Sequence, residues 1–205
     1  MTKFFEVLSK SEIRILKKLN TPVKIQNFLE TLPINFNETL YSPCLVLKNK
    51  TAHCFEGALF AASALLYNGK PAIILDLVTE HNDDSHVVAL FKEGSKWGAI
   101  SKTNHAVLRF RDPIYDSPRA VAFSYFHEYF KNDGKKTLRS YAVFNLNKIK
   151  RNWVTDERGI WHIDKALNKT KHIQFLSKSA IKKLRKADPV EIKAGKLTVW
   201  KTHKI

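Results

Sequence analysis

The segment CFEGALFAASALLY, residues 54–67, decides the fold. It is dense in Ala and Leu, which are good helix formers, and apolar side chains occur on every face of the helix that it would form. The dipeptide Asn68-Gly69 follows directly, and glycine is the preferred residue just past a helix C-terminus. The sequence therefore predicts a buried central helix that begins at Cys54 and ends at Tyr67.

Apolar runs bounded by turn residues follow this helix and are typical of strands. Residues 72–78 read AIILDLV and residues 86–91 read HVVALF, with a polar turn between them. The next Gly-Ser dipeptide suits a tight hairpin turn, so residues 96–101 are expected to return antiparallel to the preceding strand. A two-residue turn places Glu93 opposite Lys96.

Other elements are predicted from helical spacing and from breaker residues. The expected helices cover residues 2–19, 27–32, 119–130, 160–167 and 177–186, a further strand covers 137–146, irregular segments cover 35–50 and 104–118, and a terminal hairpin lies around 194–195. The expected fold class is α+β, with the central helix packed on an antiparallel sheet. We expect residues 1–150 to form the core and residues 151–205 to form a basic extension docked on it through Trp153, Trp161 and Trp200.

Charge is distributed unevenly along the 205 residues. Residues 1–130 hold 15 Lys and Arg against 13 Asp and Glu, whereas residues 131–205 hold 20 against 6, so nearly all of the net charge of +16 is C-terminal. Such a segment attracts phosphate-rich partners by releasing their counterions. It therefore favours a polyanion or nucleic acid as a partner, although basic faces often serve only to keep a protein soluble.

The remaining composition favours a cytoplasmic protein. Cysteine occurs only at positions 44 and 54, which argues against a disulfide scaffold. Residues 1–20 interleave Lys and Glu with Phe and Leu and lack the apolar region of a signal peptide. No apolar run reaches the roughly 18 residues that suggest a membrane span, so no membrane partner is expected.

A cysteine at a helix start and a histidine at a strand start are the candidates for chemistry. The first turn of a helix supplies unpaired N–H groups and a positive dipole end, which favour a thiolate at Cys54. Histidine exchanges a proton near neutral pH, so His86 is the candidate base. The sequence has neither a Cys-x-x-Cys pair nor a helical His-x-x-x-His pair, so neither a metal nor another cofactor is predicted.

Three motifs resemble the transglutaminase-like superfamily, which has a papain-like core. They are Cys54-Phe-Glu-Gly-Ala58, Gly69-Lys-Pro71, and His86-Val-Val88 followed by the hairpin with Trp97-Gly98. The resemblance covers about residues 25–115. It implies acyl transfer through a thioester on Cys54, with His86 as its base and the amide N–H of Cys54 at the helix start as one oxyanion donor.

The resemblance also implies a third residue that orients the imidazole, normally an Asp on the strand after the histidine. The matching place in this sequence, residues 101–104, holds no carboxylate. Three alternatives stay open: Asn104 as an amide acceptor, Ser101 as a weaker partner, and Asp112 from the following segment, where it equally suits a turn beside Pro113. Because loss of the orienting group costs several orders of magnitude in rate, the missing carboxylate predicts a weaker activity than the family pattern implies.

Two functions follow from these observations. The first is a thiol hydrolase or acyltransferase that acts on a peptide or amide substrate through Cys54 and His86. The alternative is a catalytically weak or inactive transglutaminase-like module that binds nucleic acid or another polyanion through residues 131–205.

Overall fold

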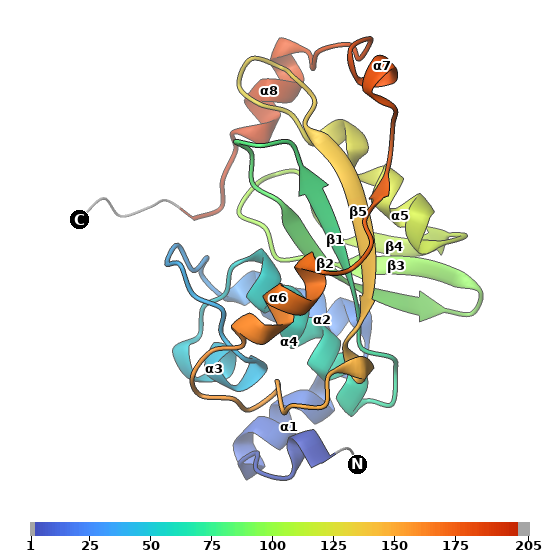
Figure 1. The fold of residues 1–205 in the computed structure, drawn as a ribbon. Helices are drawn as coiled ribbons and strands as arrows, with labels where there is room; N and C mark the ends of the chain where they lie inside the picture. The colour runs from blue at the N-terminus through green and yellow to red at the C-terminus, as the bar shows by residue number, and fades with distance from the viewer. Residues whose placement is uncertain (1–2, 201–205) are drawn as a thin grey trace.

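A six-stranded antiparallel sheet forms the centre of the fold in the computed structural model, which describes residues 3–200 (Figure 1). The strand order is β4-β3-β2-β1-β5-β6. The strands are β1 (Ile73–Thr79), β2 (His86–Glu93), β3 (Lys96–Ile100), β4 (Arg111–Tyr115), β5 (Leu138–Asn145) and β6 (Ile173–Gln174). Glu93 pairs with Lys96 at the β2–β3 turn, which confirms the predicted hairpin register.

Within residues 3–200, eight α-helices and three short 3-10 helices lie around this sheet. The α-helices are α1 (Lys10–Lys18), α2 (Pro22–Thr31), α3 (Pro43–Asn49), α4 (Cys54–Tyr67), α5 (Pro118–Ser124), α6 (Trp161–Asn168), α7 (Lys178–Ile181) and α8 (Pro189–Gly195), and the 3-10 helices are η1 (Lys3–Phe5), η2 (Phe126–Glu128) and η3 (Leu146–Lys148). The predicted α+β class is confirmed.

The central helix α4 has the predicted bounds and is buried on all sides between residues 56 and 65. It packs chiefly on β2, with α2 and α3 beside it. Gly57 lets α4 approach the segment that follows β3, because a Cβ added there would lie 2.4 Å from the Cβ of Lys102. Gly69 has the positive φ of +77° that glycine adopts most readily after a helix end.

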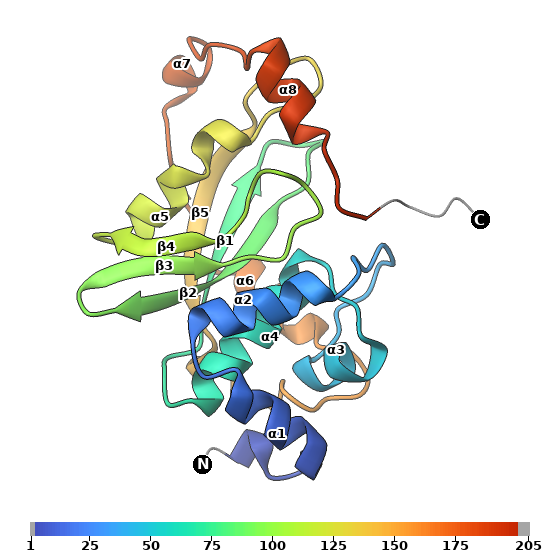
Figure 2. The same ribbon diagram turned by 180° about the vertical axis from the view of Figure 1, so that it is seen from behind.

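Both faces of the sheet are covered, so the structure has three layers (Figures 1 and 2). Alternate residues of a strand point to opposite faces. Val87 and Ala89 of β2 therefore join the core under α4, while Val88 and Leu90 join a second core against α5. This double burial explains why β1 and β2 read as nearly continuous apolar runs.

Several predicted boundaries were wrong because helix caps were overlooked. The expected loop 35–50 contains α3, which Ser42 caps with Pro43 at the first helical position. The expected terminal hairpin is instead α8, which starts with Pro189 after a capping box between Asp188 and Glu191.

The first expected helices also differ in extent. The pattern over residues 2–19 is broken into η1 and α1, because Ser9 caps α1 in a capping box with Glu12; residue 2 lies outside the described part of the chain. The helix expected at 27–32 begins earlier, at Pro22, after the Thr21 cap. The helix expected at 119–130 ends at Ser124 and is followed by η2.

The remaining corrections concern residues 104–118 and the C-terminal part. The segment 104–118, expected to be irregular, contains β4, which pairs with β3. The helix expected at 177–186 is only the short α7.

The C-terminal part contributes directly to the core beneath α4. Trp153 is fully buried there, whereas Trp161 is 45% exposed and does not anchor the segment as predicted. The anchoring side chains of α6 are Ile163 and Leu167, which are buried in the same core. Within residues 3–200, none of the helices has the length and apolar character needed to cross a membrane.

Candidate active site

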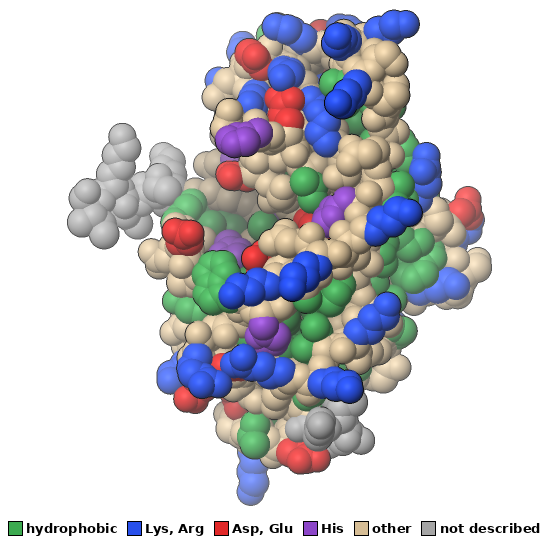
Figure 3. Space-filling view, viewed as in Figure 1, with side chains coloured by type: hydrophobic (Ala, Val, Ile, Leu, Met, Phe, Trp, Pro, Cys, Tyr) green, Lys and Arg blue, Asp and Glu red, His purple; other side chains and the backbone are tan. Residues whose placement is uncertain are grey.

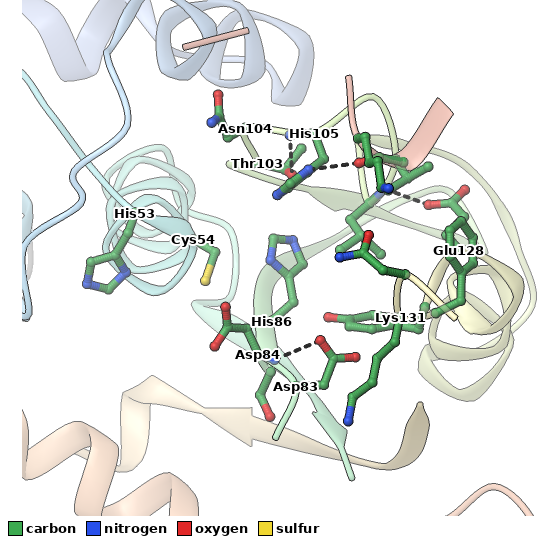
Figure 4. Close-up of a pocket in the computed structure, with 18 of the residues that line it drawn as sticks. His53, Cys54, Asp83, Asp84, His86, Thr103, Asn104, His105, Glu128 and Lys131 are labelled. Carbon is green, nitrogen blue, oxygen red and sulfur yellow. Dashed lines mark hydrogen bonds between the residues drawn. The ribbon is translucent and has the colours of Figure 1, made fainter. Parts of the chain in front are cut away.

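A cavity of about 1120 Å³ opens where α4 begins and where β2 leaves its turn. Cys54 and His86 both line it, and the Cys54 side chain points into the cavity beside the His86 ring (Figure 4). The other walls come from the β1–β2 turn and from residues 102–108, 128–133 and 192–196. Two residues that are 32 positions apart in the sequence therefore share one accessible space.

His53 fixes the backbone that carries Cys54. Its ring Nδ1 accepts a hydrogen bond from the N–H of Phe55 at 3.2 Å, so the side chain caps α4. Its Nε2 donates to the carbonyl oxygen of Thr39 at 2.7 Å, which holds the ring in place. Cys54 thus lies in the first turn of α4, as the sequence predicts.

The environment of the Cys54 sulfur favours the neutral thiol at rest. Burial raises the pKa of Cys54, and the backbone N–H groups of Val87 and Phe55 lower it by less, while the Asp84 carboxylate raises it further. Figure 4 shows Asp84 at the cavity wall near Cys54. The expectation that the helix start lowers this pKa is wrong, because burial outweighs the N–H groups.

Ser101 is the residue that contacts the far side of the His86 ring. His86 Nε2 lies 2.8 Å from Ser101 Oγ. That hydroxyl donates its own hydrogen to the carbonyl oxygen of Leu108 at 2.5 Å, so it accepts from the imidazole. The proton of the neutral ring is therefore on Nε2, and Nδ1 is the unprotonated nitrogen.

Gln26 of α2 holds Ser101 in this position. Its Oε1 accepts from the Ser101 backbone N–H at 2.9 Å, and its Nε2 donates to the Ser101 carbonyl oxygen at 2.8 Å. The sequence analysis missed this residue, because a single glutamine in a helix carries no signal for a partner 75 positions away.

The other two candidates for orienting His86 do not contact its ring. The side chain of Asn104 forms two hydrogen bonds with the backbone of Trp200, at 2.8 and 2.7 Å. Asn104 therefore ties the C-terminal segment to the cavity wall. Asp112 lies exposed on β4 and does not line the cavity.

Burial lowers the pKa of His86 to about 4, and the nearby His105 and Arg111 lower it further, against the Leu108 carbonyl, which raises it. The ring is therefore neutral at neutral pH. A neutral imidazole can accept a proton from a thiol, so the pair is in the protonation state that a general base requires.

The same pKa predicts acid sensitivity of the fold. Between pH 6.5 and about 4 the unfolded chain binds a proton at His86 that the folded chain does not, so stability falls as the pH falls through this window. We expect His86 to account for a loss of about 2 kcal/mol between pH 8 and pH 5. Urea unfolding of the wild type and of His86→Gln at both pH values checks this, because the variant should lose less stability on acidification. Equal losses in the two proteins would contradict the prediction.

No group of three or more His, Cys, Asp or Glu side chains within residues 3–200 is arranged to hold a metal ion. The sequence was also compared with protein-family models and with curated proteins, and neither comparison gave a match.

Proposed function

We propose that the chain is a transglutaminase-like thiol hydrolase or acyltransferase that acts on amide or peptide bonds through Cys54 and His86. The observation that carries the proposal is that both side chains line one cavity. In addition, Nε2 of the His86 imidazole forms a hydrogen bond with Ser101 Oγ. A nucleophile, a base and a group that orients the base are the parts that thiol catalysis needs.

In the proposed reaction Cys54 is the nucleophile, and His86 acts first as the base and then as the acid. The Cys54 proton passes to His86 Nδ1 as the sulfur forms a bond to the substrate carbonyl carbon. The imidazolium then returns the proton to the leaving amine as the C–N bond breaks, which leaves a thioester on Cys54. Water as the next acceptor gives hydrolysis, and a lysine amine gives acyl transfer. Ser101 acts by holding the ring, since its oxygen accepts from Nε2 in each protonation state.

The arrangement of elements supports the transglutaminase-like assignment. A buried helix that opens with the nucleophile packs on an antiparallel sheet, and the histidine begins the strand against which that helix packs. Ser101 in place of a carboxylate departs from the family pattern. It leaves the imidazolium without a fixed negative partner, so we expect slower turnover than from a carboxylate-containing site.

A burst experiment with p-nitrophenyl acetate tests the proposal. We expect one equivalent of p-nitrophenolate per chain, with the acetyl group found on Cys54 by peptide mass spectrometry. Cys54→Ser should reduce the burst rate by more than about 10³-fold. Cys44→Ser is the matched control and should keep the burst, because Cys44 donates to Glu12 at 2.9 Å and its pKa is raised to about 12 by burial and by that carboxylate.

Binding of a polyanion is the second function that an observation favours. The charge excess of residues 131–205 is reflected in the many Lys and Arg side chains on the face shown in Figure 3. If the wild type gives no burst that depends on Cys54 and is retained on heparin until salt is raised, the catalytic proposal is wrong and the binding function takes its place.

A further inference from the structure

Tyr129 has a buried hydroxyl group that contributes no hydrogen bond to the fold of residues 3–200. The residue follows η2, its ring packs in the core against α5, and only 4% of its surface is exposed. It also lines the cavity that contains Cys54 and His86. Its hydroxyl is fully buried and has no hydrogen-bond partner among residues 3–200. Unpaired buried polar groups are rare and destabilising, and a catalytic role is one explanation for them.

The Tyr129 hydroxyl and the Cys54 sulfur influence each other electrostatically. Burial raises the pKa of Tyr129 well above its usual value, and the next largest cause is the charge of a Cys54 thiolate. The hydroxyl is therefore protonated at neutral pH and is able to act as a donor. Because both residues line the same cavity, negative charge that develops at the nucleophile acts on this hydroxyl.

We propose that Tyr129 is a catalytic residue whose hydroxyl donates a hydrogen bond to the substrate carbonyl oxygen as that oxygen becomes negative. The inference rests on the proposed function of the Cys54–His86 pair and adds a second oxyanion donor to the backbone N–H of Cys54. A donor without a partner in the free protein suits this task, because no existing hydrogen bond has to break when the oxyanion forms.

As the sulfur bonds to the carbonyl carbon, the thiol proton moves to His86 and the π electrons of the carbonyl group move to its oxygen. Tyr129 keeps its proton and shares it with this oxyanion. When the electrons return, the carbonyl bond reforms and the leaving group departs from carbon.

Two reactions of Cys54 separate this role from any effect on the thiol itself. Acylation by p-nitrophenyl acetate passes through an oxyanion, whereas alkylation by iodoacetamide is a direct displacement without one. We expect Tyr129→Phe to slow acylation by about 10²- to 10³-fold and to leave alkylation within about two-fold of the wild type.

Tyr125→Phe is the matched control. Tyr125 is also fully buried, but its hydroxyl donates to the Arg109 carbonyl oxygen at 2.9 Å. This variant should keep the burst while its urea midpoint falls, since it removes a buried hydrogen bond and leaves Arg111 Nη1, at 3.2 Å, as the donor to that carbonyl oxygen. Tyr129→Phe should keep or raise the midpoint, because it removes a hydroxyl that has no partner.

The outcomes are distinct. A normal burst in Tyr129→Phe overturns the inference and leaves the Cys54–His86 mechanism intact. Equal slowing of acylation and alkylation also overturns it, because Tyr129 would then act on the thiol. A wild type without a burst that depends on Cys54 removes both the mechanism and this role.

Discussion

Glu56→Ala is expected to lower the free energy of unfolding by about 3–5 kcal/mol, because it removes the acceptor at the centre of a buried polar network. Glu56 is fully buried in the first turn of α4. Its carboxylate accepts from the side chains of Thr39 and Asn35, at 2.6 and 3.0 Å, and from the backbone N–H groups of Tyr41 and His53, at 2.8 and 3.0 Å. Without it, these donors, which are buried or half-buried, lose this acceptor.

Urea unfolding measures this effect, with two variants for comparison. Glu56→Gln keeps the shape and one acceptor oxygen, so it should lose less stability than the alanine variant. Glu93→Ala removes an exposed carboxylate at the β2–β3 turn and should stay within about 0.5 kcal/mol of the wild type. A Glu56→Ala protein with unchanged stability would show that the network does not hold residues 35–41 to α4.

Local signals explain why the centre of the fold was predictable. The bounds of α4 follow from the helix formers after His53 and from the glycine at position 69. The register of β2 and β3 follows from the two-residue turn, since the length of a hairpin turn sets which residues face each other. In both cases the deciding residues are neighbours in the sequence.

The missed elements divide into two physical classes. α3 and α8 carry readable start signals, Ser42-Pro43 and Asp188-Pro189, so sequence reasoning was capable of finding them. β4 is different, because its strand state depends on pairing with β3 across the intervening segment. A short segment that contains Pro113 gives no local sign of such a partner.

The same distinction applies to the site. Cys54 and His86 were identified from their places at the start of a helix and of a strand. The contact of His86 with Ser101 depends on the path of residues 101–108. Ser101 is in turn held by hydrogen bonds with Gln26, which lies in α2, far away in the sequence. The sequence therefore left Ser101, Asn104 and Asp112 as alternatives. Tyr129 lies in a run of aromatic residues, and such a density of aromatic residues indicates core packing. The sequence therefore gives no sign of the role that we propose for the Tyr129 hydroxyl.

His86→Ala is expected to slow acylation of Cys54 by p-nitrophenyl acetate by about 10²- to 10⁴-fold. The Cys54 pKa is raised by burial, so at neutral pH the sulfur carries its proton and needs a base to remove it. His86 is neutral under these conditions and is therefore able to act. Loss of the ring leaves only water or hydroxide for this task. Burst kinetics at pH 7 measure the decrease, and raising the pH should restore part of the rate in the variant.

Chemical rescue separates loss of the base from damage to the fold. The alanine leaves a space beside Cys54 in a cavity that small molecules can enter, so added imidazole should recover part of the rate in His86→Ala and have no effect on the wild type. His105→Ala is the control within the same cavity, since His105 contacts the Gly195 carbonyl oxygen at 2.9 Å and lies outside the proposed proton path. Its rate should stay within about three-fold of the wild type. A His86→Ala protein that acylates at the wild-type rate would mean that the sulfur loses its proton by another route, and the general base would then have to be sought among the remaining groups of the cavity.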